Sequence, residues 1–319
     1  MKTKLVDPEE LNLATLAMQY SDETEARKLF ESWRWPDGPV CPHCKNHKAK
    51  PIYKMESSPK TKTANRMRPG LYCCGSCRKT FTARVGTILE DSHIPFSKWL
   101  MAIFILCSSK KSVSAHQMHR MLGVTYKTAW FLCHRIRYAM GTNTDAPKLS
   151  GIVEADETFI GGKGKMNTRR LRKTPVVALV ERGGGIRAKV VPSVNRKNLR
   201  QVLSANVDAK ATLNTDEYVA YKYAPYYFTR HDSVNHSANE YVRKNADGTT
   251  SHVNSCESFF ALLKRGVHGS WHHVSREHLP KYAGEFEFRW NHRKVTDGER
   301  TVKAVEATEG KRLTYRQAI

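Results

Sequence analysis

Three acidic side chains stand where carboxylates could act together on a phosphodiester. Asp156 lies in a β-like run (GIVEADETFIGG), Asp216 ends a later run (ATLNTDEYVAY), and Glu257 stands near the start of a helical segment (VNSCESFFALLKRG). Lys264 follows Glu257 by about two helical turns, so the two side chains would share one helix face. A carboxylate cluster with a lysine at its edge suits two divalent cations and a phosphodiester.

The same acidic residues also allow simpler interpretations. Glu154 would share the strand face of Asp156 and therefore competes for its role, whereas Glu157 and Glu217 are expected to be solvated. The segment Asn254-Ser-Cys-Glu257 has the spacing of a capping box, in which the glutamate would only cap its own helix. Residue spacing alone leaves these alternatives open.

Four cysteines form two CxxC pairs, Cys41-Pro-His-Cys44 and Cys74-Gly-Ser-Cys77. Each tight turn would aim two thiolates at one point, and two such turns complete a tetrahedral zinc site. The gap between the pairs is longer than usual, so an inserted hairpin or loop is expected. Cys73 would point away, and His43 is a weaker ligand candidate. Such a zinc ribbon could grip DNA, bind protein or only fold the N-terminal region.

The chain of 319 residues is strongly basic, with 53 Lys and Arg against 30 Asp and Glu. Over half of the net charge of +23 falls in residues 57–144, where Glu90 and Asp91 are the only acidic residues. A concentrated positive block of this kind is typical of proteins that contact nucleic-acid phosphates. The length, with a hydrophobic content of 40%, predicts about two globular domains.

A helix-turn-helix is predicted within residues 114–137 (SAHQMHRMLGVTYKTAWFLCHRIR). With Gly123 at the turn, apolar residues fall where two helices would pack, and Thr125 could cap the second helix. An ordinary helical hairpin would show the same pattern, but the lack of acidic residues from 92 to 144 favours DNA, read through bases or held through phosphates alone. The candidate DNA contacts are Thr125, Tyr126, Lys127, His134 and Arg135, together with Lys264 and Arg265.

The pattern changes from helical to β-like at a linker expected near residues 145–150. Helices are predicted at 8–34 and 93–140. The elements predicted after the linker are strands at 152–159, 175–181 and 187–194, a helix at 196–206, a strand at 211–215, a short helix at 217–224, a weak strand at 226–229, a loop at 231–252 and a helix at 256–265. This order, β-β-β-α-β-α-β-α, is that of a ribonuclease-H-like domain, whose first and fourth strands lie side by side and would bring Asp156 and Asp216 together.

The predicted fold class is therefore α/β (α+β), with an N-terminal zinc ribbon and helix-turn-helix before a ribonuclease-H-like mixed β-sheet flanked by helices. The expected segments are a helical segment (1–40), the zinc ribbon (41–92), the helix-turn-helix domain (93–144), the catalytic domain (150–293) and a C-terminal extension (294–319).

A membrane location is not expected. The longest apolar run, residues 99–107, falls far short of the roughly 20 residues that a membrane span needs, and the N-terminus lacks the apolar core of a signal peptide. A cytoplasmic location, at the bacterial nucleoid, is expected. Cysteines in that reducing compartment serve as metal ligands or core residues rather than as disulfides.

The chain resembles bacterial insertion-sequence transposases that have an N-terminal zinc ribbon and an ISXO-like DDE catalytic domain. The matching stretches are FESWRWPDGPVCPHC, CGSCRKTFTARVGTILEDSHIPFSKWLMAIF, GVTYKTAWFLCHRIR, VEADETFIGGK, NTDEYVAY, VNHSANEY and HVNSCESFFALLKRGVHGSWHHVSREHLPKYAGEFEFRWNHR. They cover nearly all of residues 10–293 in the order of the family, and the residues after 294 lie outside the match.

The resemblance implies a DNA transposase that cleaves a strand with metal-activated water and transfers it with a DNA 3′-hydroxyl. Asp156 and Asp216 match the two aspartates of the family, Glu257 its third acid and Lys264 its downstream basic residue. Some relatives have Asn at the third position, which makes Asn254 an alternative ligand. The implied cofactors are a pair of Mg²⁺ (or Mn²⁺) ions and one structural Zn²⁺. The implied partner is double-stranded DNA, as transposon ends and target, bound by a homodimer or larger assembly.

Two other functions are compatible with the sequence. A regulator with an inactive catalytic domain would bind DNA without cutting it, although the intact acidic residues argue against this. A ribonuclease-H-like nuclease, such as a junction resolvase, would cut selected DNA structures without strand transfer.

Overall fold

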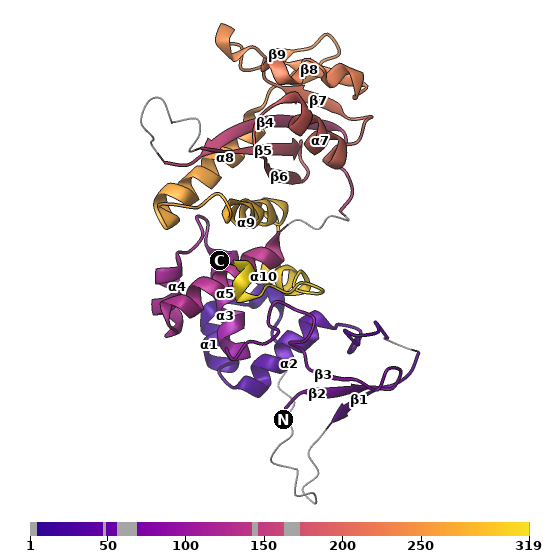
Figure 1. Cartoon of the computed structure of the whole chain (residues 1–319), viewed down its shortest axis with the longest axis vertical. Helices are drawn as coiled ribbons and strands as arrows, with labels where there is room; N and C mark the ends of the chain where they lie inside the picture. Colours follow the sequence, from indigo (N-terminus) through magenta and orange to yellow (C-terminus); the bar gives the residue numbers. More distant parts are fainter. Residues whose placement is uncertain (1–4, 47–48, 56–68, 142–145, 163–172, 319) are drawn as a thin grey trace, which may run out of the picture. The chain divides into compact units, whose positions relative to one another are not determined.

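The computed structural model describes residues 5–46, 49–55, 69–141, 146–162 and 173–318. The chain divides into two compact units, one made of residues 1–140 with 294–319 and the other of residues 141–293. Figure 1 labels the helices and strands of both units. The C-terminal residues, expected from the sequence only as an extension, thus belong to the N-terminal unit.

The first unit is built around α3 (Phe96–Ser108), a helix whose sequence is apolar on nearly every side. Such a helix must be enclosed by other elements, and α3 is contacted by α1 (Leu13–Gln19), α2 (Glu23–Arg34) and α10 (Asp297–Glu306). The other helices in the described part of this unit are η1 (Pro8–Glu10), α4 (Ala115–Leu122), α5 (Tyr126–Met140) and α11 (Tyr315–Ala318).

The helix α10 is closely fitted to the N-terminal residues of the same unit. A Cβ atom at Gly298 would lie 1.9 Å from the carbonyl oxygen of Pro8, so only glycine allows this approach. Further along, Glu309 forms an ion pair of 2.7 Å with the buried guanidinium of Arg34. Residues 294–319 are therefore part of the packing of this unit.

A small antiparallel sheet follows the first cysteine pair and includes Cys74 of the second. Its strands are β1 (Ile52–Met55), β2 (Leu71–Cys74) and β3 (Thr80–Phe81), in that order across the sheet. The insertion expected between the two CxxC pairs contains the paired strands β1 and β2, and residues 56–68 between them lie outside the described residues.

The second unit is a mixed five-stranded sheet with helices on both faces (Figure 1). Its strands are β4 (Ile152–Ile160), β5 (Thr174–Glu181), β6 (Ile186–Val190), β7 (Thr212–Thr215) and β8 (Arg230–Ser233), in the spatial order β6-β5-β4-β7-β8. The pairs β4–β5 and β5–β6 are antiparallel, whereas β4–β7 and β7–β8 are parallel. This is the ribonuclease-H-like arrangement that the sequence predicts.

Successive side chains of the central strand, β4, pack into two separate hydrophobic cores, one on each face of the sheet. Val153 and Ala155 face a core shared with α7 (Arg196–Asn206). Ile160 faces the opposite core, to which α8 (Asn254–Gly266) and α9 (Leu279–Asn291) contribute. Because the period of a strand is two, Glu154 and Asp156 share the α8 side of the sheet.

The prediction of a weak strand at 226–229 is wrong. A 3-10 helix, η5 (Ala224–Tyr226), ends there, and Phe228 is buried under α7 in the first of these cores. The fifth strand is β8, whose sequence RHDS has no apolar alternation because it lies at the edge of the sheet. The short helix predicted at 217–224 is reduced to η4 (Val219–Tyr221).

The region predicted as a loop at 231–252 contains regular structure as well. It holds the 3-10 helix η6 (His236–Ala238) and a small hairpin of β9 (Arg243–Lys244) and β10 (Thr250–Ser251). The helix α8 continues into a π-helical turn, η7 (Val267–Trp271). None of the helices in the described part of the chain combines the length and the apolar character needed to cross a membrane.

Candidate functional site: a cysteine cluster and an acidic cluster

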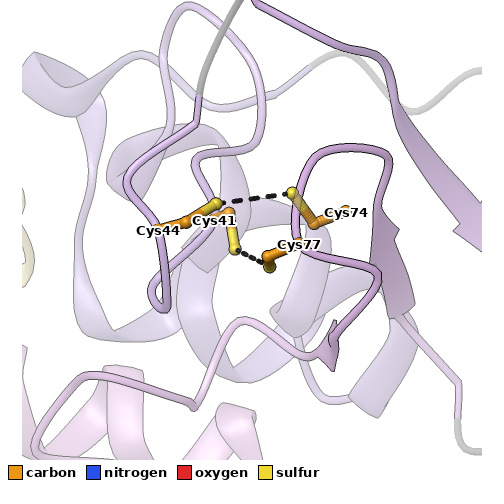
Figure 2. A group of neighbouring side chains, drawn as sticks. All are labelled: Cys41, Cys44, Cys74 and Cys77. Atoms are coloured by element: carbon orange, nitrogen blue, oxygen red, sulfur yellow. Dashed lines mark hydrogen bonds between the residues drawn. The ribbon is translucent and has the colours of Figure 1, made fainter.

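The two CxxC turns bring four sulfur atoms to one point (Figure 2). All four lie within 4.8 Å of one another, and the Sγ atoms are 3.7 Å apart both between Cys41 and Cys77 and between Cys44 and Cys74. A tetrahedral Zn²⁺ with Zn–S bonds of about 2.3 Å would separate its sulfurs by about 3.8 Å. The cluster therefore fits zinc, as predicted.

The same backbone turn is built twice around these cysteines. The N–H groups of Lys45 and Arg78 donate to the carbonyl oxygens of Cys41 and Cys74, each at 2.9 Å, and both donors have positive φ (57° and 59°). Backbone N–H groups at Cys77 and Ser76 lower the pKa of Cys74 to about 6, against the effect of burial. The turn at Cys74 thus favours the thiolate form of that residue, which is the form that binds a metal.

Two other residues near the turns are not part of the cluster. The Sγ atom of Cys73 faces the carbonyl oxygen of Arg78 at 4.0 Å, and the His43 side chain is exposed. The prediction that Cys73 is not a zinc ligand agrees with this geometry.

The acidic candidates come from two adjacent strands and one helix. The parallel register of β4 and β7 pairs Glu154 with Asn214, so Asp156 and Asp216 stand at one level two residues further along. Burial, together with the negative charges of Asp216 and Glu257, raises the pKa of Asp156 to about 6. Burial also raises the pKa of Asp216. Asp156 is therefore close enough to Asp216 and Glu257 for their negative charges to act on it.

The acidic cluster is more open than the cysteine cluster. Among the described residues, only the four cysteines place three or more metal-binding atoms within 4.8 Å of one another. Two cations about 3.5–4 Å apart need wider ligand spacing than one zinc ion, because ligands to different cations lie on opposite sides of the pair. The three acidic residues thus do not form a compact single-ion site of the kind that the four cysteines form.

Glu154 does not compete with Asp156 for a metal. Its side chain is fully buried, and it accepts hydrogen bonds from Arg182 Nε (2.9 Å), from the backbone N–H of Ser255 (2.8 Å) and from the Ser255 hydroxyl (3.1 Å). Both carboxylate oxygens are therefore already occupied by donors from β5–β6 and α8.

The interpretation of Glu257 as a helix cap is not supported. The residue before α8 is Val253, and no side chain of that position caps the helix. The carboxylate that accepts from the first turn of α8 is Glu154, at Ser255. Glu257 and Asn254 are both exposed, and so are the predicted phosphate contacts Lys264 and Arg265 further along α8.

Two features next to the acidic cluster were not predicted from the sequence. Electrostatic attraction by His236 opposes part of the rise in the pKa of both Asp156 and Asp216. Its loop is held by Glu217, whose carboxylate accepts from the backbone N–H groups of His236 (2.9 Å) and Ser237 (3.0 Å). A histidine in a polar loop after an edge strand has no sequence pattern that would identify it.

The expectation that Glu157 is merely solvated is also wrong. Its carboxylate accepts a hydrogen bond of 2.8 Å from the buried Tyr221 hydroxyl. Burial, with the charges of Asp216 and Asp156, raises the pKa of Glu157 to about 7. The negative charge at this end of β4 is thus larger than the three candidates alone would supply.

The helix-turn-helix segment has the predicted turn. Gly123 adopts the left-handed conformation (φ 59°) that ends α4, and Thr125 Oγ1 accepts from the backbone N–H of Thr128 at 3.2 Å, which caps α5. At the start of α5, Tyr126 is exposed and stacks on His116, and the Lys127 ammonium lies 4.8 Å from the centre of the Tyr315 ring.

The predicted DNA contacts at His134 and Arg135 are wrong, because both side chains face the interior of the first unit. His134 has no exposed surface and lies against the Trp130 ring at 4.1 Å. Arg135 is 6% exposed and donates to the carbonyl oxygens of Leu313 (3.1 Å) and Glu90 (2.8 Å). Its charge stabilises the fold and is not available to a phosphate.

A ribonuclease-H-like sheet with an acidic cluster, joined to a four-cysteine zinc ribbon, defines a class of nucleic-acid-processing proteins. Residues 148–291 match the family model of the ISXO2-like transposase domain, and residues 21–80 match that of the transposase zinc-ribbon domain. The chain is also 29% identical to an uncharacterised protein in transposable element ISH50 of Halobacterium salinarum, over 85% of this chain and 91% of the relative. The chain therefore carries a transposase zinc-ribbon domain followed by an ISXO2-like transposase domain.

Proposed function

We propose that this transposase cleaves a DNA strand at transposon ends and transfers it to a target, with Asp156, Asp216 and Glu257 as the ligands of divalent cations. The observation that carries this proposal is the parallel register of β4 and β7, which sets Asp156 and Asp216 at one level, near enough for the charges of Asp216 and Glu257 to contribute to the raised pKa of Asp156. Like charges are held together in a folded protein at a cost in free energy, and bound cations would remove that cost.

Each side chain has a role that follows from its place. Bound Mg²⁺ ions supply positive charge to the attacking and leaving oxygens of the phosphodiester. Asp156, on the central strand β4, would contribute to holding both cations, and Asp216 and Glu257 would each hold one. Lys264, exposed on α8, would bind a DNA phosphate near the scissile bond.

The third ligand is assigned to Glu257 rather than to Asn254. The charge of Glu257 acts on Asp156, which requires the two carboxylates to be near each other. Asn254 is the first residue of α8, one helical turn upstream, and carries no charge to hold a cation.

The partner is double-stranded DNA, with Tyr126 and Lys127 at the exposed start of α5 as contacts and the basic residues of 57–144 supplying much of the attraction. Concerted cleavage of two transposon ends requires two active sites, so a homodimer or larger assembly on DNA is part of the proposal. The reaction would take place in the cytoplasm, where the DNA is.

The test is cleavage and strand transfer of end-sequence duplexes with Mg²⁺ by variants of the full chain. Asp156→Asn, Asp216→Asn and Glu257→Gln should each lower the cleavage rate by orders of magnitude and leave duplex binding intact. Asn254→Ala should keep most of the activity. An active Glu257→Gln with an inactive Asn254→Ala would move the third ligand one turn upstream.

The same assay separates the alternative functions. Cleavage without any strand transfer would indicate a nuclease, and metal-dependent binding without cleavage by the unmodified chain would indicate a regulator. Either result would contradict the proposed transposition reaction.

A further inference from the structure

A surface of paired arginines and tyrosines lies in the second unit, on α7 and on the segment between β7 and β8. The guanidinium carbon of Arg196 is 3.5 Å from the centre of the Tyr223 ring, and that of Arg200 is 4.4 Å from the centre of the Tyr227 ring. The arginines are one helical turn apart on α7, so the two pairs lie next to each other. These four residues with Tyr226 are called the tyrosine–arginine surface.

The inner side of this surface is firmly anchored. Leu199 and Leu203 of α7 are buried in the same core as Tyr221, Ala224 and Phe228 of the facing segment. Both elements are thereby fixed to one face of the sheet (Figure 1). The arginine and tyrosine side chains are thus presented on a fixed base and not on a free loop.

The outer side exposes aromatic rings to solvent. Tyr226 is 79% exposed and Tyr223 is 40% exposed, and their rings are nearly parallel, 6.4 Å apart. Grouped exposed rings with a charged rim are typical of a binding surface. A hollow beside them is lined by Lys148, Arg200, Tyr226, Tyr227 and Phe228, among others.

The charge of this surface favours an anionic partner. The sequence of α7, RKNLRQVLSAN, has no acidic residue, and Arg196 and Lys197 occupy its first turn. Cations at that end are disfavoured by the helix dipole, so their presence does not serve the stability of the helix. Lys222, exposed between the tyrosines, adds a further positive charge.

Tyr218 connects Asp216, at the end of β7, to the face of the sheet that carries this surface. The backbone N–H of Tyr218 donates to Oδ1 of Asp216 at 3.0 Å, and the Tyr218 hydroxyl donates to the carbonyl oxygen of Val194, just before α7, at 3.4 Å. A polymer held at Asp216 could therefore continue across Tyr218 towards the tyrosine–arginine surface without leaving the second unit.

We propose that the tyrosine–arginine surface binds an unpaired stretch of DNA adjoining the reacting phosphodiester. An exposed ring stacks only on a base whose face is free, which a base in an intact duplex does not offer. The guanidinium groups, held over tyrosine rings, keep N–H donors for the phosphates of the same strand. The placement of this strand next to the reacting bond rests on the proposed function. The binding of an unpaired strand to the tyrosine–arginine surface does not.

The experiment measures binding by the full zinc-containing chain without added Mg²⁺, so that no cleavage is involved. Two probes are compared, an end-sequence duplex with an unpaired thymine overhang and the same duplex fully paired. Tyr226→Ala should weaken binding to the overhang probe by roughly fivefold or more and leave the paired probe unchanged. Tyr226→Phe keeps the ring and is the matched control, with binding unchanged on both probes.

A second measurement locates the contact. With 5-iododeoxyuridine in the overhang, irradiation should cross-link the strand to a peptide that contains residues 223–227, and Tyr226→Ala should remove that cross-link. An equal loss of affinity for both probes would overturn the proposal, since it would indicate a duplex contact. Unchanged binding with no cross-link in this segment, as expected if the surface instead docks a second protein chain, would overturn it as well.

The outcome is independent of catalysis. If Tyr226→Ala weakens overhang binding while the unmodified chain shows no Mg²⁺-dependent cleavage, the surface is retained and the proposed reaction is rejected. If cleavage requires Asp156 but Tyr226→Ala binds both probes normally, the reaction is retained and the surface is rejected.

Discussion

The backbone N–H of Ser255 donates a 2.8 Å hydrogen bond to Oε2 of Glu154, a carboxylate that lies 101 residues earlier in the chain. Ser255 is in the first turn of α8, which lacks a side-chain cap at Val253. Glu154 supplies the missing acceptor from the central strand, two residues from Asp156. One strand therefore carries both an acidic ligand candidate and the anchor of the helix that carries Glu257.

Loss of the Glu154 charge should weaken this anchor. In Glu154→Gln, the Arg182 guanidinium, now 2.9 Å from the carboxylate, would be left without its buried counterion. The free energy of unfolding should fall by roughly 3 kcal/mol in a denaturant titration. In the fraction that stays folded, cleavage should need a higher Mg²⁺ concentration for half-maximal rate, because Glu257 is less well positioned.

An exposed ion pair provides the matched control for this substitution. Glu240 pairs with Arg243 at 2.6 Å on the surface of the same unit, so Glu240→Gln should change the unfolding free energy by less than about 1 kcal/mol. Equal effects of the two substitutions, or an unaltered Mg²⁺ requirement in Glu154→Gln, would contradict a positioning role.

The acidic cluster should make the protein less stable as the pH rises, when no divalent cation is present. The pKa of Asp156 is about 6 in the folded chain, against 3.8 for the ordinary side chain, so the folded state binds this proton more tightly than the unfolded state. The stabilisation from protonation is present at low pH and is lost between about pH 4 and pH 6, up to about 3 kcal/mol. Asp156→Asn should therefore raise the melting temperature at pH 7.5 and flatten this part of the pH profile.

Glu217 provides a control, because its pKa is shifted in the opposite direction to that of Asp156. Hydrogen bonds from Ser237 and from the His236 backbone lower its pKa to about 2, so its contribution to stability is present above the ordinary pKa and is lost on acidification. Glu217→Gln should lower the melting temperature at pH 7.5. If thermal unfolding without Mg²⁺ showed Asp156→Asn to be no more stable than the unmodified chain, the argument from the raised pKa of Asp156 would be refuted.

The cysteine cluster predicts one zinc ion per chain. Cys74→Ser should lose the zinc and destabilise the ribbon, because a structural zinc site contributes directly to folding. Cys73→Ser changes the adjacent residue, whose sulfur lies outside the cluster, and should keep the metal. Elemental analysis of metal-washed protein would show the difference, and full zinc content in Cys74→Ser would mean that these four cysteines are not the ligand set.

The parts of the fold that were predictable are those with a strong local pattern. The apolar runs at β4 and β5 and the two CxxC turns each carry their own signal, and their order along the chain is enough to predict the sheet and the zinc site. The edge strand β8, with sequence RHDS, carries no such signal, because its pairing with β7 depends on a neighbour and not on its own side chains.

The inward direction of Arg135 and the role of Glu154 could not be predicted for a related reason. Arg135 is buried because the carbonyl oxygens of Glu90 and Leu313, far away in the sequence, accept its N–H groups. Glu154 is satisfied by Ser255 and Arg182, which also come from distant segments. A charged residue on a predicted helix or strand is assigned to the surface until its distant partners are known.

Lys127 is exposed and Arg135 is buried, although both lie on α5, eight residues apart. Substitutions of the two residues should therefore have different effects. Lys127→Gln should weaken binding to an end-sequence duplex and reduce the slope of log K against log salt by about 1, with no change in the melting temperature. Arg135→Gln should instead lower the melting temperature, because the carbonyl oxygens of Leu313 and Glu90 would lose their donors.

The salt titrations must use the full chain, because α10 packs on α3 and a fragment without residues 294–319 would expose that apolar helix. At a temperature where Arg135→Gln is folded, its salt slope should equal that of the unmodified chain. A reduced slope in Arg135→Gln, with an unchanged slope in Lys127→Gln, would place the DNA contact on the other side of α5.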